Sequence, residues 1–266
     1  MRFQFLIVLI VLGLSLTGYS QEKQHYLDVH PGWSHSLVKD DGVSQMIYKG
    51  SSFFIQGAYE KVTPVIIHRV GVSFRYGKMR SGIYPQRTSS ELTQIQPEIN
   101  YSFLFRVKKM KDTSLVLYCG GSFSHNYLFY YHNSFSNNST FSNYITTLAV
   151  KARMGKYFRI KSRKLQGIAE IELPVMGFIT RPSFASSRFE HQLSNEDNYF
   201  NDILKSGEFK TPGKFQEVFF RTSLRYFLKN GNILAINYLW NYLHDKKLNE
   251  LYFASHAVSF STIFKF

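Results

Sequence analysis

The sequence predicts an all-β fold, namely a closed antiparallel transmembrane up-and-down β-barrel of ten strands, with eight strands as the alternative. Three observations predict it. Long segments alternate apolar and polar residues, no apolar run after residue 20 approaches the length of a spanning helix, and the chain has 25 Phe and 18 Tyr but only 7 Pro. Because lipid offers no water to unpaired backbone groups, a chain without spanning helices can cross a membrane only as a closed barrel.

The N-terminus predicts export. Arg2 gives a positive start, residues 5–16 form an almost unbroken apolar run, and the small residues Gly18 and Ser20 occupy the two positions that a signal peptidase reads. The run is too short for a span of about 20 residues. We therefore expect a signal peptide over residues 1–20, cleaved near Ser20-Gln21, and a single barrel domain over residues 21–266.

Charge and cysteine content narrow the class further. Removal of residues 1–20 takes away one of the 32 basic residues and no acid, which leaves 31 minus 18, or +13. A chain with this positive charge could bind nucleic acid, but an exported protein does not meet it. We therefore expect the basic residues to contact the phosphates of lipopolysaccharide. The single cysteine, Cys119, excludes an intramolecular disulfide. The sequence contains no metal-ligand spacing and no phosphate-binding loop, so we expect no metal and no cofactor.

The clearest strand covers residues 93–107. Its apolar face carries Ile95, Ile99, Tyr101, Phe103, Phe105 and Val107, and its polar face carries Gln94, Gln96, Glu98, Asn100, Ser102 and Arg106. Soluble strands usually have about five or six residues. A length of 15 residues is instead typical of a tilted membrane strand that continues into water. Similar alternation recurs in residues 69–76, 144–154, 217–226 and 234–242.

The links between these strands alternate in length, as expected when one rim of a barrel faces the periplasm. Short polar links are expected near 62–64, 108–112, 161–164 and 229–231, and longer ones near 40–45, 80–92, 131–141, 181–214 and 244–250. This alternation favours ten strands if residues 26–38 form the first one. Pro31-Gly32 interrupts that segment, and if it is not a strand, the barrel has eight.

The last strand ends on an aromatic residue. Val258, Phe260, Phe264 and Phe266 alternate with Ser259, Ser261, Ile263 and Lys265, and Phe266 is the final residue. This pattern resembles the C-terminal signature of bacterial outer-membrane barrels, in which a terminal Phe is read by the outer-membrane assembly machinery. Gln21 after the cleavage site resembles exported proteins of Bacteroidetes-type bacteria. The resemblance implies an outer-membrane location among phospholipid and lipopolysaccharide, and it matches no specific functional family.

Inward-facing charges form the first candidate site. Counting from the short turns, we expect Arg153 near Glu170, Lys151 near Glu172, and Arg221 at the height of Glu172. Arg75 and Glu98 are expected to pair on the opposite wall, and Arg225 also faces inward. Buried charges need partners because desolvation is costly. A lumen filled with salt bridges is one interpretation. The alternative is a small channel that prefers anions, because inward bases outnumber acids in this reading.

Three functions remain open at this point. The first is a structural, adhesion or envelope-assembly role, without enzymatic activity, in which the external loop near 181–214 meets a protein partner. The second is the anion-preferring channel. The third is a lipid or peptide hydrolase at the outer rim. His132-Asn133-Ser134 is similar to the His-x-Ser-Asn motif of lipid A deacylases, but Phe135 replaces the Asn. An omptin-like protease would need convergent Asp and His residues; the candidates are His191, Glu196, Asp197, Asp202, His244 and Asp245.

Overall fold

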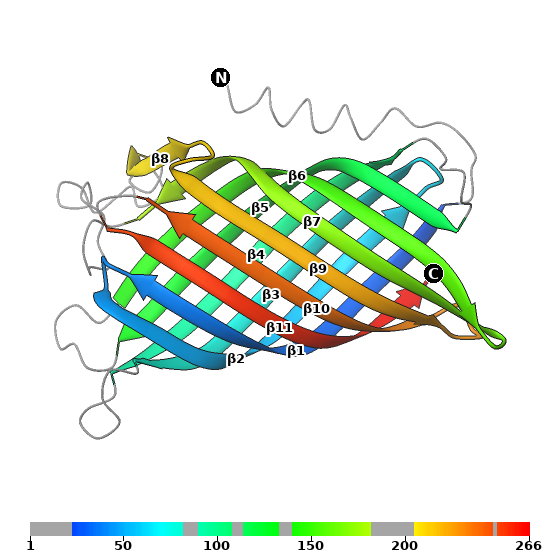
Figure 1. Ribbon diagram of the computed structural model, residues 1–266, viewed down its shortest axis with the longest axis horizontal. Coiled ribbons are helices and arrows are strands. Elements are labelled where there is room, and N and C mark those ends of the chain that lie inside the picture. Colours follow the sequence, from blue (N-terminus) through cyan, green and yellow to red (C-terminus); the bar gives the residue numbers. More distant parts are fainter. Residues whose placement is uncertain (1–22, 82–89, 108–113, 133–139, 182–204, 247–248) are drawn as a thin grey trace.

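The computed structural model describes residues 23–81, 90–107, 114–132, 140–181, 205–246 and 249–266. The described chain is built almost entirely of β-strands (Figure 1). Ten strands pair antiparallel with their sequence neighbours, and the last pairs with the first, which closes the barrel. The predicted fold class is therefore confirmed. No helix in the described ranges has the length and hydropathy needed to cross a membrane.

The barrel strands are long. Their bounds are β1 (Gln24–Asp40), β2 (Ser44–Val62), β3 (Ile66–Ser81), β4 (Glu91–Arg106), β5 (Leu115–His132), β6 (Thr140–Ile160), β7 (Arg163–Thr180), β9 (Phe215–Phe227), β10 (Ile233–Asp245) and β11 (Leu251–Lys265). The shortest have 13 residues and the longest has 21, whereas about 9–11 residues cross a bilayer when tilted. The strands therefore extend into water beyond the membrane.

Every break between barrel strands falls at a predicted link. The breaks at the predicted short links lie together at the rim that holds the C-terminus, and the breaks at the predicted longer links lie at the opposite rim (Figure 1). The observed lengths overlap, since the break at 107–114 is longer than the break at 41–43. We call these the short-turn rim and the long-link rim. The signal-peptide segment 1–20 lies outside the described residues, as do residues 182–204 of the longest link. The described part of that link contains one short extra strand, β8 (Gly207–Lys210), which pairs with the end of β7.

The first segment is a strand despite Pro31-Gly32, so the eight-stranded alternative is wrong. β1 pairs continuously with β2, but its ladder with β11 is interrupted at His30 and Pro31. Proline has no N–H and is tolerated where a ladder is broken. Position 32 requires glycine, because a Cβ there would lie 2.5 Å from the carbonyl oxygen of Val258 on β11.

The period-two pattern sorts side chains between lipid and lumen. In β4, Ile99, Phe103 and Phe105 are exposed on the outer face, whereas Gln94, Gln96 and Ser102 are buried inside. The outer face of the other strands carries the same kind of exposed apolar residues. An apolar surface that surrounds the whole barrel is stable only in contact with lipid.

Candidate functional site

The centre of the lumen holds a network of buried ion pairs, and Glu60 on β2 is its hub. Arg153 on β6 binds both carboxylate oxygens of Glu60, with Nη1–Oε2 and Nη2–Oε1 distances of 2.9 and 3.4 Å. Arg69 on β3 contacts Glu60 at 3.3 Å and Asp28 on β1 at 3.0 Å. All four side chains are buried. The network therefore links four strands, and β6 lies across the lumen from the others.

Two of the expected pairs on the β6–β7 wall are present. Arg153 Nε lies 3.3 Å from Glu170, and Lys151 Nζ lies 2.7 Å from Glu172. Lys151 also contacts Glu170 at 3.3 Å. These residues face each other directly in the ladder, since Lys151 is opposite Glu172 and Arg153 is opposite Glu170. The inferred turn at 161–162 was sufficient to set this register.

Other predicted pairings differ in the structure. Arg221 was expected at the height of Glu172, but in the β7–β9 ladder it faces Glu170, one inward position away. It lies 3.6 Å from Asp28 and 3.3 Å from the Asn237 side-chain oxygen. The twist and stagger of the barrel bring β1 closer to Arg221 than a count along flat strands suggests.

Arg75 and Glu98 do not form an ion pair. The Arg75 guanidinium donates to Gln96 at 3.2 Å and Ser255 at 3.4 Å. Glu98 accepts a hydrogen bond from Asn100. Arg225 is buried nearby, and no ion pair joins it to any described residue.

The charge of the lumen core is balanced, contrary to the expected excess of bases. The inward carboxylates are Asp28, Glu60, Glu98, Glu170, Glu172 and Glu217, and the inward bases are Arg69, Arg75, Lys151, Arg153, Arg221 and Arg225. Six acids against six bases give this part of the described lumen a formal net charge of zero. Sequence reasoning missed Asp28 and Glu60, although each follows an outward apolar residue and therefore occupies an inward position.

A polar cavity lies beside this network. It has a volume of about 80 Å³ and is bordered by Glu98, Glu172, Glu217, Asn126 and Arg75 among others. About 10–15 Å³ of space for a water-sized sphere is enough to hold one water, so this polar cavity has room for several waters. No group of His, Cys, Asp or Glu in the described ranges has the arrangement of a metal site.

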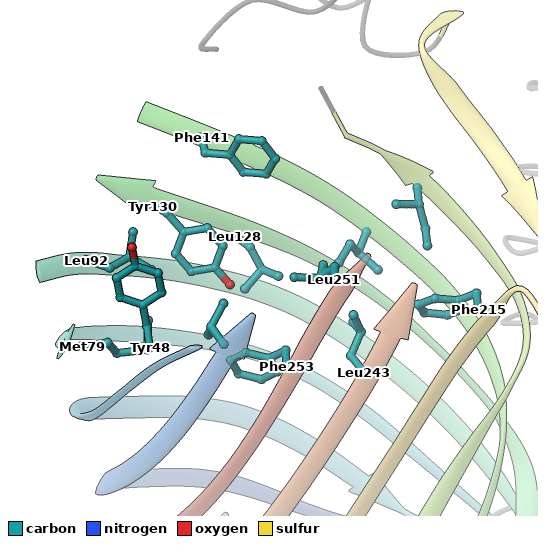
Figure 2. Close-up of a cluster of buried hydrophobic side chains, with 13 residues drawn as sticks. Tyr48, Met79, Leu92, Leu128, Tyr130, Phe141, Phe215, Leu243, Leu251 and Phe253 are labelled. Atoms are coloured by element: carbon teal, nitrogen blue, oxygen red, sulfur yellow. The ribbon is translucent and has the colours of Figure 1, made fainter. Parts of the chain in front are cut away.

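Toward the long-link rim, an apolar plug fills the lumen (Figure 2). We use this name for the buried cluster Val38, Tyr48, Met79, Leu92, Leu128, Tyr130, Phe141, Ile145, Ile179, Phe215, Leu243, Leu251 and Phe253. All ten barrel strands contribute to it. No member is more than 3% exposed. Inward side chains that lined an open pore would contact water, so the plug closes the lumen at this level.

An ionic clamp closes the mouth above the plug. Arg181, directly after β7, contacts Asp40 of β1 at 2.8 Å and Asp245 of β10 at 3.0 Å. Lys210 of β8 also binds Asp245. Asn143 of β6 donates to Asp40 and accepts from Arg181. The clamp thus connects four barrel strands with β8, the described strand of the longest link.

The predicted hydrolase residues are arranged unfavourably for catalysis. His132 faces inward, where its Nε2 lies 2.6 Å from Ser90 Oγ and 2.8 Å from Tyr48 Oη. All three side chains are at most 8% exposed, so an acyl substrate has no access to this cluster. Asn133, Ser134 and Phe135 lie outside the described residues, as do the rim candidates His191, Glu196, Asp197 and Asp202.

The remaining rim candidates also have other contacts. Asp245 is held in the ionic clamp, and the ring of His244 stacks on Tyr252 with centroids 4.0 Å apart.

The predicted assembly-signal residues Phe260, Phe264 and Phe266 are 67%, 43% and 69% exposed on the outside of the closing strand or just beyond it.

Ten antiparallel strands, an apolar outer face and a filled lumen define the class: the chain is a closed β-barrel of the bacterial outer-membrane type. No protein-family model matches its sequence, and no curated protein matches it. The fold is similar to that of the outer membrane protease OmpT from Escherichia coli, with 8% identity, a TM-score of 0.54, and coverage of 95% of this chain and 99% of that chain. At this identity the likeness concerns the fold and not the activity.

A looser similarity exists to the translocator domain of the autotransporter NalP from Neisseria meningitidis. The identity is 6% and the TM-score is 0.39, with 100% of this chain and 95% of that chain covered.

Proposed function

We propose that this protein is a non-conducting barrel of the outer membrane with a structural, adhesion or envelope-assembly role and no enzymatic activity. The short-turn rim faces the periplasm in this proposal, and the long-link rim faces outward. The link at 181–214 is the segment that meets a protein partner. The apolar plug is the observation that carries the proposal, because a lumen filled from all ten strands serves as a rigid support and not as a passage.

The neutral lumen supports the same conclusion. The anion-preferring channel depended on an excess of inward bases, but the six inward bases face six inward acids. Ten strands also enclose an interior close to the size that side chains fill. The ionic clamp joins β8 to the barrel wall, which gives the external link a fixed attachment for binding a partner.

Two measurements test this proposal. The outer-membrane fraction is run on SDS gels with and without boiling, and we expect a mobility shift because closed barrels resist SDS until boiled. The purified barrel is then placed in planar bilayers, where we expect no conductance steps. Stable steps with anion selectivity would contradict the closed lumen. Protein found only in a soluble fraction, with no mobility shift, would contradict the membrane barrel.

The partner role has its own test. Residues 182–204 are replaced by a short Gly-Ser linker, which leaves Arg181, β8 and the clamp in place. We expect the mobility shift to remain, while adhesion of cells or their resistance to detergent falls to the level of cells that lack the protein. Unchanged behaviour of such cells in both assays would argue against the external link as the functional segment.

A further inference from the structure

The two rims differ sharply in charge. The short-turn rim carries ten Lys and Arg residues in the described chain, five at positions 23, 61, 106, 229 and 265 and five within residues 156–164. The described acid nearest this end is Glu60, which is buried and already paired with Arg153 and Arg69 in the lumen. The long-link rim has nine described bases, at positions 39, 49, 78, 80, 181, 205, 210, 214 and 246, but six described acids, at positions 40, 41, 91, 208, 245 and 250, offset most of their charge. The net positive charge of the described barrel is therefore concentrated at the short-turn rim.

Half of this charge belongs to the hairpin that joins β6 to β7. The ladder with β5 ends where Leu115 faces Lys156, and the ladder with β9 ends where Tyr226 faces Leu165. In the part of the chain that the structure describes, one further backbone bond, from Tyr157 to Ser114, holds the hairpin to β5. Residues 158–164 therefore project beyond the rim, as the green hairpin does in Figure 1.

The projection has the depth of a lipid headgroup layer. Three residues at about 3.3 Å each extend about 10 Å along the strand, or about 7–8 Å along the barrel axis at a tilt of about 40°. The headgroup region adds roughly 5–8 Å to each side of the hydrocarbon core. A hairpin of this length spans the headgroup layer when the rim lies at the edge of the hydrocarbon core.

The outward side of the hairpin mixes apolar and basic residues. Phe158 and Ile160 continue the apolar outer face of β6, and Lys156 and Arg163 lie beside them. Ile160 is 57% exposed. None of the five cations of the hairpin has a described carboxylate within 4.0 Å. Their charges are therefore available to an external anion.

An apolar groove begins at the base of this hairpin. It lies on the lipid-facing wall, has a volume of about 750 Å³, and is lined by Leu165, Leu224, Tyr226, Phe260, Thr262 and Phe264 among others. Thr262 is small and stands between the two Phe residues of the closing strand, which leaves room between them. Arg163 lies at the hairpin end of the groove, with its guanidinium 5.9 Å from the centre of the Tyr226 ring.

We propose that the hairpin and the groove bind an anionic phospholipid of the periplasmic leaflet. The acyl chains lie in the groove, and the headgroup phosphate lies against Arg163 and its neighbouring cations. The depth of the projection and the continuity of the groove with the lipid-facing wall favour a lipid over a periplasmic polymer or protein. The assignment of the leaflet rests on the proposed function, because it uses the same orientation of the barrel.

The test is native mass spectrometry of the folded full-length barrel with phosphatidylglycerol or phosphatidylethanolamine. We expect the barrel to retain phosphatidylglycerol preferentially. A variant with Lys156→Gln, Lys161→Gln and Arg163→Gln should bind it about fivefold more weakly for each cation removed. The matched control removes three cations from the opposite rim, with Lys39→Gln, Lys49→Gln and Lys78→Gln, and should bind as the unmodified protein does.

A second variant probes the groove without changing charge. Thr262→Leu fills the groove floor with an apolar group that is compatible with lipid, and we expect weaker retention of phosphatidylglycerol. Equal retention of the two lipids by the unmodified barrel, or equal losses in the hairpin variant and its control, would overturn the proposal. Sedimentation of the barrel with peptidoglycan is the last comparison. A hairpin variant that still retains the lipid but no longer sediments with peptidoglycan would also overturn the proposal, because the cations would then bind that polymer.

The mobility shift on SDS gels is recorded for every sample. A shifted barrel with no preference for phosphatidylglycerol contradicts the lipid site alone. A chain that never shows the shift contradicts the proposed membrane barrel itself, so the two failures are distinguishable.

Discussion

Replacement of Glu60 by Gln should strongly destabilise the barrel. Glu60 is 3% exposed and neutralises two guanidinium groups, those of Arg153 and Arg69. Removal of one partner from a buried ion pair costs about 3–5 kcal/mol because the remaining charge stays desolvated. Arg153 keeps Glu170 and Arg69 keeps Asp28 as partners. We therefore expect the lower end of that range, about 3 kcal/mol of unfolding free energy.

The assay is equilibrium unfolding in urea of the barrel folded into vesicles, followed by fluorescence of Trp33 and Trp240, the only two Trp residues. The double variant Glu60→Gln/Arg153→Gln removes one charge of each sign and should lose less stability than Glu60→Gln alone. Glu91→Gln is the control, because Glu91 lies on the outer face and its ion-pair partners Lys78 and Arg80 are exposed. A loss below about 1 kcal/mol in Glu60→Gln, or a double variant that is less stable than the single one, would refute the role of this network as a stabilising core.

Gly120→Ala should destabilise the barrel by about 1–3 kcal/mol, because the new Cβ would lie 2.1 Å from the Phe103 carbonyl oxygen. Gly57→Ala, whose Cβ meets nothing within 4 Å, should be tolerated, and equal urea midpoints for the two would contradict this reasoning. Arg181→Gln should loosen the clamp and increase proteolytic cleavage of the 181–214 link on intact cells. Lys205→Gln, an exposed residue of the same link, should leave cleavage unchanged, and identical cleavage patterns would count against the clamp. Phe266→Ala should reduce the amount of heat-shifted protein in the outer membrane, and normal amounts would remove this residue from the assembly signal.

The strand positions were predictable because alternation and turn composition are local properties. The register of Lys151 and Arg153 with Glu172 and Glu170 followed from the tight turn between β6 and β7. Contacts across the lumen were not predictable in this way. Arg153 and Glu60 are 93 positions apart, and their meeting depends on the number, tilt and stagger of all ten strands.

The sequence by itself determined a closed barrel and the side of each strand that faces lipid, since a period of two leaves each residue only two orientations. It favoured ten strands over eight, and the pairing of the first segment with β2 and β11 decided for ten. Only the tertiary structure decided what the interior does. Val38, Leu92 and Phe253 each appear as ordinary apolar residues near a strand end, and nothing local shows that they meet. Closure of the barrel brings them to one level, where they form the apolar plug. The same closure sets six inward acids against six inward bases, which changes the predicted cationic lumen into a neutral and filled one.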